Sequence, residues 1–278
     1  MANEESFLFR DIPVLRKRVH RLGLATNYGL DDRGFHAALE RGLNYVFWPV
    51  RSEAKSTALR EALHRDRERL VVAAVPTLGL MGWSVRRGAE KALRSLGTDY
   101  IDILQLGWLG RASAWTKGTV DELVKLREEG KVRAIGVSIH DRPRAGRLAA
   151  DSPLDMLMIR YNAAHPGAER DIFPHLSERP AAKGRPAFIV AYTATSWGKL
   201  LERPEGWTGP VATAGDCYRF ALTSPHVDLV LCGPANQAQL EENLAALEKG
   251  PLSSEELAWM RELGQRVHAK NGIPFAPR

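Results

Sequence analysis

Eight short apolar segments recur along this chain, and longer amphipathic segments separate them. The apolar segments occupy residues 21–25, 43–48, 70–75, 100–106, 132–137, 154–159, 187–192 and 227–232. They are rich in Val, Ile and Leu, and the longest has seven residues. Continuous apolar runs of this length predict strands that are buried on both faces, as in a parallel sheet.

The segments between them carry residues that are typical of the ends of helices. Residues 31–42, 84–97 and 116–131 each end on or next to a glycine, at Gly42, Gly97 and Gly130, which suits the position just after a helix. Ser84 is expected to cap the second of these helices. Helical patterns also cover residues 236–247 and 253–270.

Strand–helix units repeated eight times in 278 residues predict an α/β protein, a single (β/α)8 TIM barrel spanning residues 1–278. Residues 1–20 are interpreted as an N-terminal extension, and residues 253–278 as a C-terminal helix and tail. A doubly wound sheet is the alternative. It is disfavoured because the turn after the first strand, "GLATNYG", lacks the glycine pattern of dinucleotide-binding folds.

Composition excludes several classes of protein. The net charge is +6, but the basic residues are scattered and alternate with Glu, so no nucleic-acid site is expected. The two cysteines, Cys217 and Cys232, have no zinc-like spacing, and we expect no metal. The sequence has no apolar run long enough for a membrane span and no apolar stretch of the kind found in signal peptides. We therefore expect a cytoplasmic protein.

Several segments in consecutive order carry a family resemblance. They are "LGLAT" (22–26), "ALERGLNYVFW" (38–48), "EKALRSLGTDYIDILQLGW" (90–108), "LREEGKVRAIGVS" (126–138) and "GPANQAQLEENLAAL" (233–247). Together they resemble the aldo-keto reductase family, which implies a TIM barrel of aldo-keto reductase type. They also imply carbonyl reduction with a nicotinamide cofactor, catalysed by an Asp, Tyr, Lys and His tetrad in which the Lys lowers the pKa of the Tyr.

The resemblance assigns the four tetrad positions to residues that cannot do that chemistry. Phe47 stands at the Asp position, Ser52 at the Tyr position, Val75 at the Lys position and Gly107 at the His position. This indicates a divergent member of the family that lacks the tetrad, so no catalytic residue is assigned.

The cofactor site that the resemblance implies is also incomplete. At the nicotinamide end, Ser138 is kept, whereas Ile139 and Met158 replace an Asn and a Gln that bind the carboxamide. Tyr192 stands where an aromatic ring stacks on the nicotinamide.

At the adenine end Gln239, Glu242 and Asn243 remain, but residues 233–235 offer no base for a 2′-phosphate. Asn236 and Gln239 fit equally well as a helix cap. We therefore expect either no cofactor or weak binding of NAD(P)H.

Aromatic and apolar side chains are expected to surround the former active site and to form a ligand pocket. The residues assigned to it are Trp48, Trp108, Met158, Arg160 and Trp197. Arg160 could bind a ligand carboxylate or pair with Glu53 or Asp155. His140 and His165 are loop residues that could act as bases.

The sequence favours a pseudoenzyme that binds a hydrophobic or aromatic small molecule, or a protein partner, at the barrel mouth. One alternative is a non-redox enzyme, such as a lyase, cyclase or isomerase, in the same pocket. Another is a residual NAD(P)-dependent oxidoreductase with a rearranged site. We expect a monomer or a weak oligomer.

Overall fold

Eight parallel strands close into a barrel in the computed structural model, which describes residues 7–51, 55–180, 184 and 186–270. Neighbouring strands follow the chain order, and the last pairs with the first. The strands are β3 (Leu22–Ala25), β4 (Tyr45–Pro49), β5 (Val71–Val75), β6 (Ile101–Leu106), β7 (Val132–Ile139), β8 (Met156–Arg160), β9 (Phe188–Tyr192) and β10 (Leu229–Cys232). The predicted (β/α)8 barrel is confirmed.

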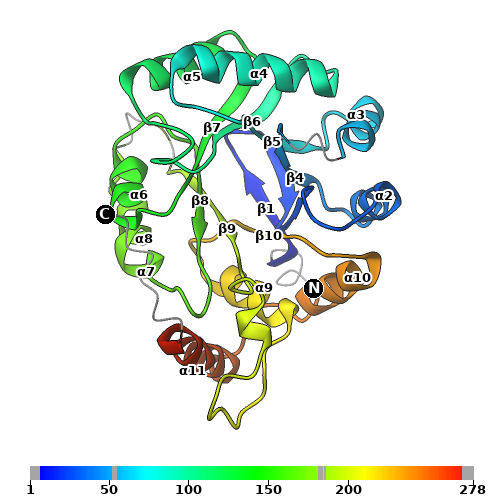
Figure 1. Cartoon of the computed structure of the whole chain (residues 1–278), viewed down its shortest axis with the longest axis vertical. Helices are drawn as coiled ribbons and strands as arrows, with labels where there is room; N and C mark the ends of the chain where they lie inside the picture. The colour runs from blue at the N-terminus through cyan, green and yellow to red at the C-terminus, as the bar shows by residue number, and fades with distance from the viewer. Residues whose placement is uncertain (1–6, 52–54, 181–183, 185, 271–278) are drawn as a thin grey trace.

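Helices surround the barrel (Figure 1). They are α2 (Asp32–Glu40), α3 (Ser56–Arg65), α4 (Gly82–Leu96), α5 (Lys117–Glu128), α6 (Arg142–Ala150), α7 (Ala168–Asp171), α8 (Phe173–Leu176), the 3-10 turn η2 (Lys199–Leu201), α9 (Ala214–Thr223), α10 (Gln237–Leu247) and α11 (Ser254–Lys270). No described helix has the length and apolarity to cross a bilayer.

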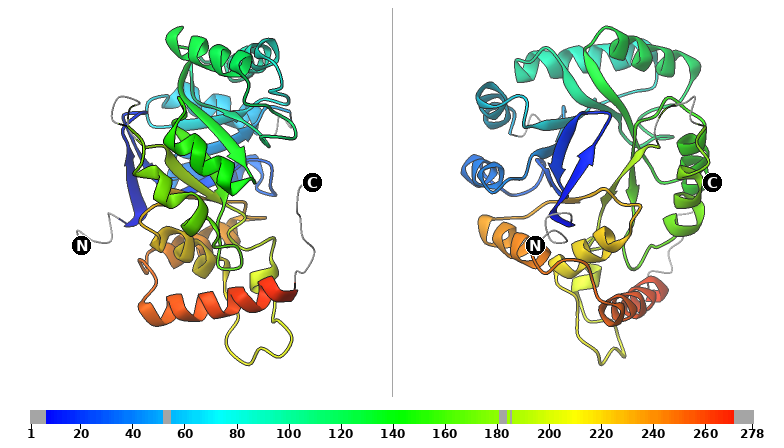
Figure 2. Two further views of the ribbon diagram at one scale, coloured as in Figure 1. Left: turned by 90° about the vertical axis from the view of Figure 1, so that its left-hand side faces the viewer. Right: turned by 180° about the vertical axis from the view of Figure 1, so that it is seen from behind.

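The N-terminal segment closes one end of the barrel. An antiparallel hairpin of β1 (Phe9–Ile12) and β2 (Lys17–His20) crosses the end at which the barrel strands begin (Figure 2). Its apolar side chains Ile12, Leu15 and Val19 pack into the barrel interior. Residues 9–20 therefore belong to the core and are not only an extension. We call the opposite, open end of the barrel, at which the strands end, the mouth.

Strand residues alternate between the barrel interior and the layer beneath the helices. On β4, Tyr45 lies in the interior cluster and Phe47 packs against it, whereas Val46 and Trp48 lie in the outer cluster. This alternation follows from the pleat of a strand, in which successive side chains point to opposite faces. Trp48 is 0% exposed. Its assignment to the pocket was wrong, because residues adjacent on a strand cannot both face the mouth.

Helix ends follow the expected glycines, with one correction. Gly42 and Gly97 have φ values of +96° and +62°, the left-handed conformation that glycine tolerates best. Ser84 does not cap α4, which begins two residues earlier at Gly82. The hydroxyl of Ser84 instead reaches back: it accepts from the Met81 N–H (3.2 Å) and donates to the Met81 carbonyl (2.7 Å).

A buried carboxylate joins the hairpin to the barrel. The Asp102 carboxylate accepts hydrogen bonds from Lys17 Nζ (2.9 Å) and Arg67 Nη2 (2.9 Å), and from the Val72 N–H (3.0 Å). Asp102 is fully buried, so these donors replace the water that a carboxylate needs. The cluster fixes β2, β5 and β6 to one another at the closed end.

We predict that His20 makes the folded state less stable as the pH falls from about 6.5 to 4. Burial lowers the pKa of His20 to about 4, and its Nδ1 accepts a hydrogen bond from the Leu22 N–H (3.0 Å). In this pH range the unfolded chain binds a proton that the folded chain does not. The His20 contribution is therefore unfavourable at low pH and absent above neutrality.

The substitution His20→Asn keeps an acceptor for Leu22 and removes the titration. Between pH 7 and pH 5, the wild type should lose about 2 kcal/mol more of its unfolding free energy than this variant does. Urea unfolding at several pH values measures the difference. Parallel stability profiles for the two proteins would contradict the prediction.

Candidate active site

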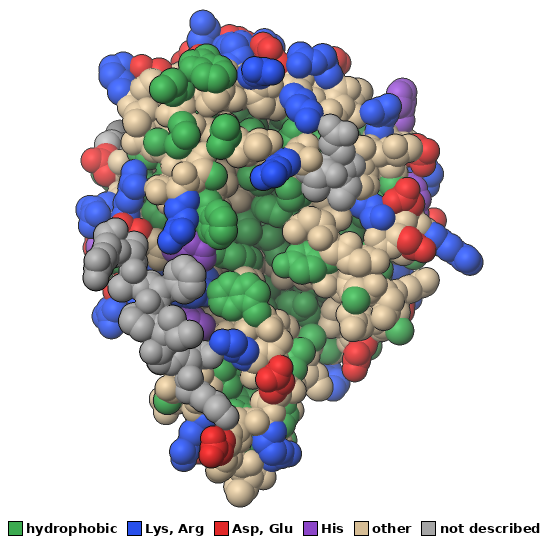
Figure 3. Space-filling model, in the orientation of Figure 1, with side chains coloured by type: hydrophobic (Ala, Val, Ile, Leu, Met, Phe, Trp, Pro, Cys, Tyr) green, Lys and Arg blue, Asp and Glu red, His purple; other side chains and the backbone are tan. Residues whose placement is uncertain are grey.

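The mouth is lined by the last inward-facing residue of each strand. Every second residue of a strand faces the same side, so the residues two or four positions beyond the interior cluster also face inward, at the mouth. Six consecutive strands, β4 to β9, supply such mouth residues. They are Phe47, Val75, Gly107, Ser138, Arg160 and Tyr192. Figure 3, viewed as Figure 1, shows a hollow here with hydrophobic side chains at its base and basic ones around it. In TIM barrels the active site lies at this end of the strands.

Three aromatic side chains, one from β9 and two from the loops after β6 and β7, meet at one side of the mouth. The indole Nε1–H of Trp108 donates to Nε2 of His140 at 2.9 Å, and the hydroxyl of Tyr192 lies 3.0 Å from the same nitrogen. An indole N–H can only donate, so Nε2 is an acceptor and the neutral ring carries its proton on Nδ1. Nε2 has a single lone pair, so the Trp108 N–H and the Tyr192 hydroxyl would have to share it. We call these residues the mouth triad.

Electrostatics keep the members of the triad uncharged at neutral pH. Burial, followed by the charges of Arg160 and Arg111, lowers the pKa of His140. Burial raises the pKa of Tyr192 to about 12, although the charge of Arg160 acts in the opposite direction. The site therefore presents a protonated phenol beside a neutral imidazole.

Backbone hydrogen bonds fix the position of Trp108. Its N–H donates to the Ser138 hydroxyl (2.8 Å), and the Leu109 N–H donates to the Ser138 carbonyl (2.8 Å). Trp108 has a φ of +48°, a strained conformation for a residue with a side chain. Such strain is concentrated at functional sites. Trp108 is 55% exposed, so packing does not explain the conformation.

Arg160 and Trp197 form the neighbouring wall of the mouth. The Arg160 guanidinium lies 5.9 Å from the centre of the Trp197 ring, and Trp197 is 61% exposed. Arg160 pairs with Tyr192 in the register of β8 and β9, so their side chains emerge next to each other. Asp155, one expected partner of Arg160, instead bonds to Arg127 (3.1 Å). Glu53, the other one, lies outside the described residues.

The positions assigned to the tetrad carry apolar groups wherever the structure describes them. Phe47 packs on the interior core, and Val75 and Gly107 end the neighbouring strands. A Cβ atom on Gly107 would lie 2.7 Å from Cγ1 of Val75, which is closer than real Cβ contacts. Val75 thus occupies the space that a side chain at position 107 needs. Ser52 lies outside the described residues.

His165, the second candidate base, has a structural role. Its Nδ1 lies 3.2 Å from the Asn162 Oδ1, and the Asn162 amide donates to the Thr193 carbonyl (2.7 Å). Burial, followed by the charge of Arg160, lowers the pKa of His165 to about 4. The ring therefore acts as a neutral link between the loops that follow β8 and β9.

The residues at the expected nicotinamide end fit that group only in part. Ser138 and Tyr192 both reach the mouth, and the Ser138 hydroxyl keeps its proton to donate. Ile139 faces the outer layer, and its expected place beside the former site was wrong for the same reason as that of Trp48. Met158 is buried one layer below the mouth, where its sulfur accepts from the Gln105 amide (3.1 Å).

The residues at the expected adenine end fit better. Gln239 is used as a cap, because its Oε1 accepts from the Ala235 N–H (2.8 Å) while its own N–H donates to Asn236 (3.0 Å). Asn243 is buried, and among the described residues its amide has no hydrogen-bond partner. Glu242 is exposed. Asn243 thus offers an unused amide to a ligand.

The sequence did not reveal the mouth triad. The sequence indicates His140 only as an isolated histidine in a loop, and Tyr192 only as a ring that stacks on the nicotinamide. The available signal was the spacing of two residues between Ser138 and His140, which places both on the face of β7 that points to the mouth. Their contact with Trp108 depends on strand order and could not be read from one segment.

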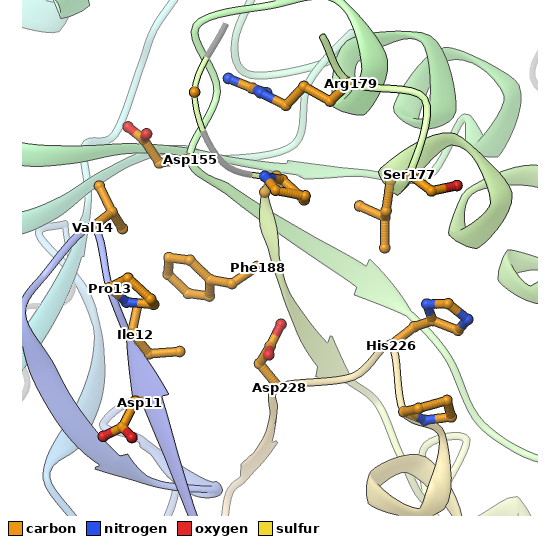
Figure 4. A pocket seen from close by; sticks show the side chains of 15 residues that line it. Asp11, Ile12, Pro13, Val14, Asp155, Ser177, Arg179, Phe188, His226 and Asp228 are labelled. Atoms are coloured by element: carbon orange, nitrogen blue, oxygen red, sulfur yellow. The ribbon is translucent and has the colours of Figure 1, made fainter. Parts of the chain in front are cut away.

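A separate groove of about 800 Å³ lies at the closed end of the barrel (Figure 4). Two of its three carboxylates already cap strands: Asp155 accepts from the Ile135 N–H (2.8 Å) and Asp228 from the Ile189 N–H (2.8 Å), whereas Asp11 is exposed. Arg179 donates to the Leu154 carbonyl (3.0 Å). The polar groups of the groove therefore support the fold. No described group of His, Cys, Asp and Glu could hold a metal ion.

Curated relatives resemble the chain in sequence, and solved structures share its barrel fold. The chain is 25% identical over 219 residues to the NADH-specific methylglyoxal reductase of Escherichia coli, covering 66% of this chain and 65% of the relative. It is 24% identical to the L-galactose dehydrogenase of Arabidopsis thaliana, covering 59% and 57%. The matched region thus spans less than two thirds of either relative.

Among solved structures, the holo form of an aldo-keto reductase from Bacillus halodurans superposes with a TM-score of 0.76 at 22% identity, covering 92% of this chain and 95% of the other. An aldo-keto reductase from Klebsiella pneumoniae in complex with NADPH gives 0.72 at 23% identity, covering 90% and 93%. Residues 57–205, more than half of the chain, match the family model described as the aldo/keto reductase family. With its barrel and mouth as described, the chain belongs to the aldo/keto reductase family.

Proposed function

We propose that the chain is a nicotinamide-dependent oxidoreductase whose proton-donating group has moved from the tetrad positions to the mouth triad. The observation that carries this proposal is the Tyr192 hydroxyl, which lies 3.0 Å from His140 Nε2 at the open end of the barrel. Relatives named as a reductase and a dehydrogenase support the reaction class. The rearranged site accounts for Phe47, Val75 and Gly107.

Ser138, Tyr192 and Asn243 are the residues that would hold the cofactor, and when bound it would supply hydride to a carbonyl carbon. The chain must then supply a proton to the carbonyl oxygen. Tyr192 is the candidate donor because its phenol is protonated at neutral pH and its hydroxyl lies at the mouth, beside His140. The positive charge of Arg160 next to it would stabilise the phenolate that remains.

His140 and Trp108 position the phenol. The Trp108 indole fixes the imidazole ring through Nε2, and the ring in turn holds the Tyr192 hydroxyl at the mouth. After turnover the phenolate would take its proton from solvent, because the neutral His140 ring has no proton on Nε2 to give. His140 and Trp108 are therefore assigned as positioning residues.

One observation favours a second function: the side chain of Val75 fills the space next to Gly107 that another side chain would need. A mouth filled in this way suits a barrel that binds a small molecule without redox chemistry. Titration with NADPH and NADH, read by tryptophan fluorescence and by thermal shift, separates the two functions. A ligand of the native state raises stability with its concentration relative to Kd. Micromolar binding supports the oxidoreductase, and no response at millimolar cofactor supports the second function.

We predict that Tyr192→Phe lowers kcat/KM for NADPH-dependent aldehyde reduction by about 100-fold, because it removes the proton donor and keeps the ring. Cofactor affinity should stay close to that of the wild type. Tyr192→Ala serves as the comparison, since it removes the ring as well. Unchanged turnover in Tyr192→Phe, with loss of cofactor binding in Tyr192→Ala, would mean that Tyr192 only stacks and the proposed acid is wrong.

We also predict that Gly107→Ala destabilises the fold by roughly 1–3 kcal/mol, because the new methyl group overlaps Val75 Cγ1. The double variant Gly107→Ala/Val75→Ala should recover much of this loss relative to Val75→Ala alone. Urea unfolding of the four proteins gives the coupling energy between the two positions. Additive effects would show that Val75 does not fill this space.

A further inference from the structure

We propose that the mouth binds carboxylate-bearing carbonyl compounds with an apolar or aromatic body, and that Arg160 binds the carboxylate. The inference rests on the proposed function for the carbonyl, because it names the substrate class of the same site. Its first support is the position of Arg160, which is the last inward-facing residue of β8 and lies one layer above buried Met158. The guanidinium therefore points into the mouth.

Arg160 has no acidic partner among the described residues, in contrast to several other arginines that are half-buried or buried. Arg142 binds Asp171 (3.0 Å), Arg127 binds Asp155 (3.1 Å) and Arg219 binds Glu256 (2.8 Å). No Asp or Glu pairs with Arg160 within the described part of the chain, where its contact is the Trp197 ring. A half-buried charge without a partner is unfavourable, and a bound anion would offset that cost.

Within the described part of the chain, no carboxylate is placed to compensate the charge of Arg160. Burial lowers the pKa of Arg160, Tyr192 opposes this shift, and the charge of Arg142 adds to it. The pKa of His165 is lowered by burial and by the positive charges of Arg160 and Arg142, and no acidic group acts on it. The same holds for His140, on which Arg160 and Arg111 act. The mouth therefore favours an anionic ligand.

The planar shape of the guanidinium and the side chains around it further restrict the chemical class of the ligand. A planar guanidinium fork matches a carboxylate, which it can bind through two parallel hydrogen bonds. Trp197 and Trp108, both exposed at the mouth, offer flat faces to an aromatic body. Phe47 and Val75 supply an apolar wall.

The register of β8 and β9 places the carbonyl next to the carboxylate. Arg160 and Tyr192 are Cα partners across these strands, and adjacent strands lie about 4.8 Å apart. A ligand that holds its carboxylate on Arg160 brings a neighbouring carbonyl oxygen towards the Tyr192 hydroxyl. The substrate class is therefore an oxo acid, with the carbonyl close to the carboxylate and the apolar group beyond it.

Binding and turnover are measured separately. Calorimetric titration compares 3-phenylpropanoate with its neutral amide, 3-phenylpropanamide, and NADPH oxidation compares phenylpyruvate with phenylacetone, which carries a methyl group in place of the carboxylate. We expect the acid to bind at least about tenfold more tightly than the amide. The acid should lose that advantage in Arg160→Met and most of it in Arg160→Lys, which keeps the charge and loses the fork.

Arg111→Met is the matched control, because it removes an exposed positive charge of the mouth region and leaves Arg160 in place. It should change the affinity for 3-phenylpropanoate by less than about threefold. Equal losses in Arg111→Met and Arg160→Met would show a diffuse electrostatic effect and would overturn the inference. So would an Arg160→Met variant that loses NADPH affinity and keeps its affinity for the acid, because Arg160 would then bind a cofactor phosphate.

The two proposals can fail independently. Tight binding of 3-phenylpropanoate that depends on Arg160, without NADPH oxidation on any carbonyl compound, supports the carboxylate site and rejects the oxidoreductase. Equal turnover of phenylpyruvate and phenylacetone supports the oxidoreductase and rejects the carboxylate site. Arg160→Lys keeps the test decisive where Arg160→Met does not fold.

Discussion

Closure of the barrel fixes on which side of the wall every strand residue lies, and the site depends on this constraint. Eight strands pair in a complete ring, so no strand can shift by one residue without moving its whole apolar set to the other side. The interior is filled by one set of side chains and the outer layer by another. The mouth is the space that the interior side chains leave unfilled at the end where the strands finish.

The closed end and the open end of the barrel use polar groups differently. At the closed end, Asp102 is saturated by Lys17, Arg67 and a backbone N–H, and the hairpin completes the core. At the mouth, Arg160 lacks an acidic partner among the described residues, and Trp108 holds a strained backbone conformation. Saturated polar groups stabilise a fold, whereas unsatisfied ones are available to a ligand. This contrast supports the proposed site at the mouth.

Two residues that match the family pattern have structural contacts of their own. Ser138 serves a structural purpose by anchoring the loop of Trp108, independently of any cofactor. Gln239 caps the start of α10 in the same way. Residues that match the family pattern can therefore persist for packing and capping, and a match alone does not assign their chemistry.

The sequence by itself determined the eight strands, the barrel and most helix ends, because continuous apolar runs and glycine stops are local signals. It also located Arg160, Trp108 and Trp197 at the mouth, since each follows a strand. Only the tertiary structure decided that Trp48 is core, that the segment before Leu22 plugs the barrel, and that His140 joins Trp108 to Tyr192. The physical reason is that these outcomes depend on side-chain alternation in a closed ring and on contacts between different strands, which no single segment encodes.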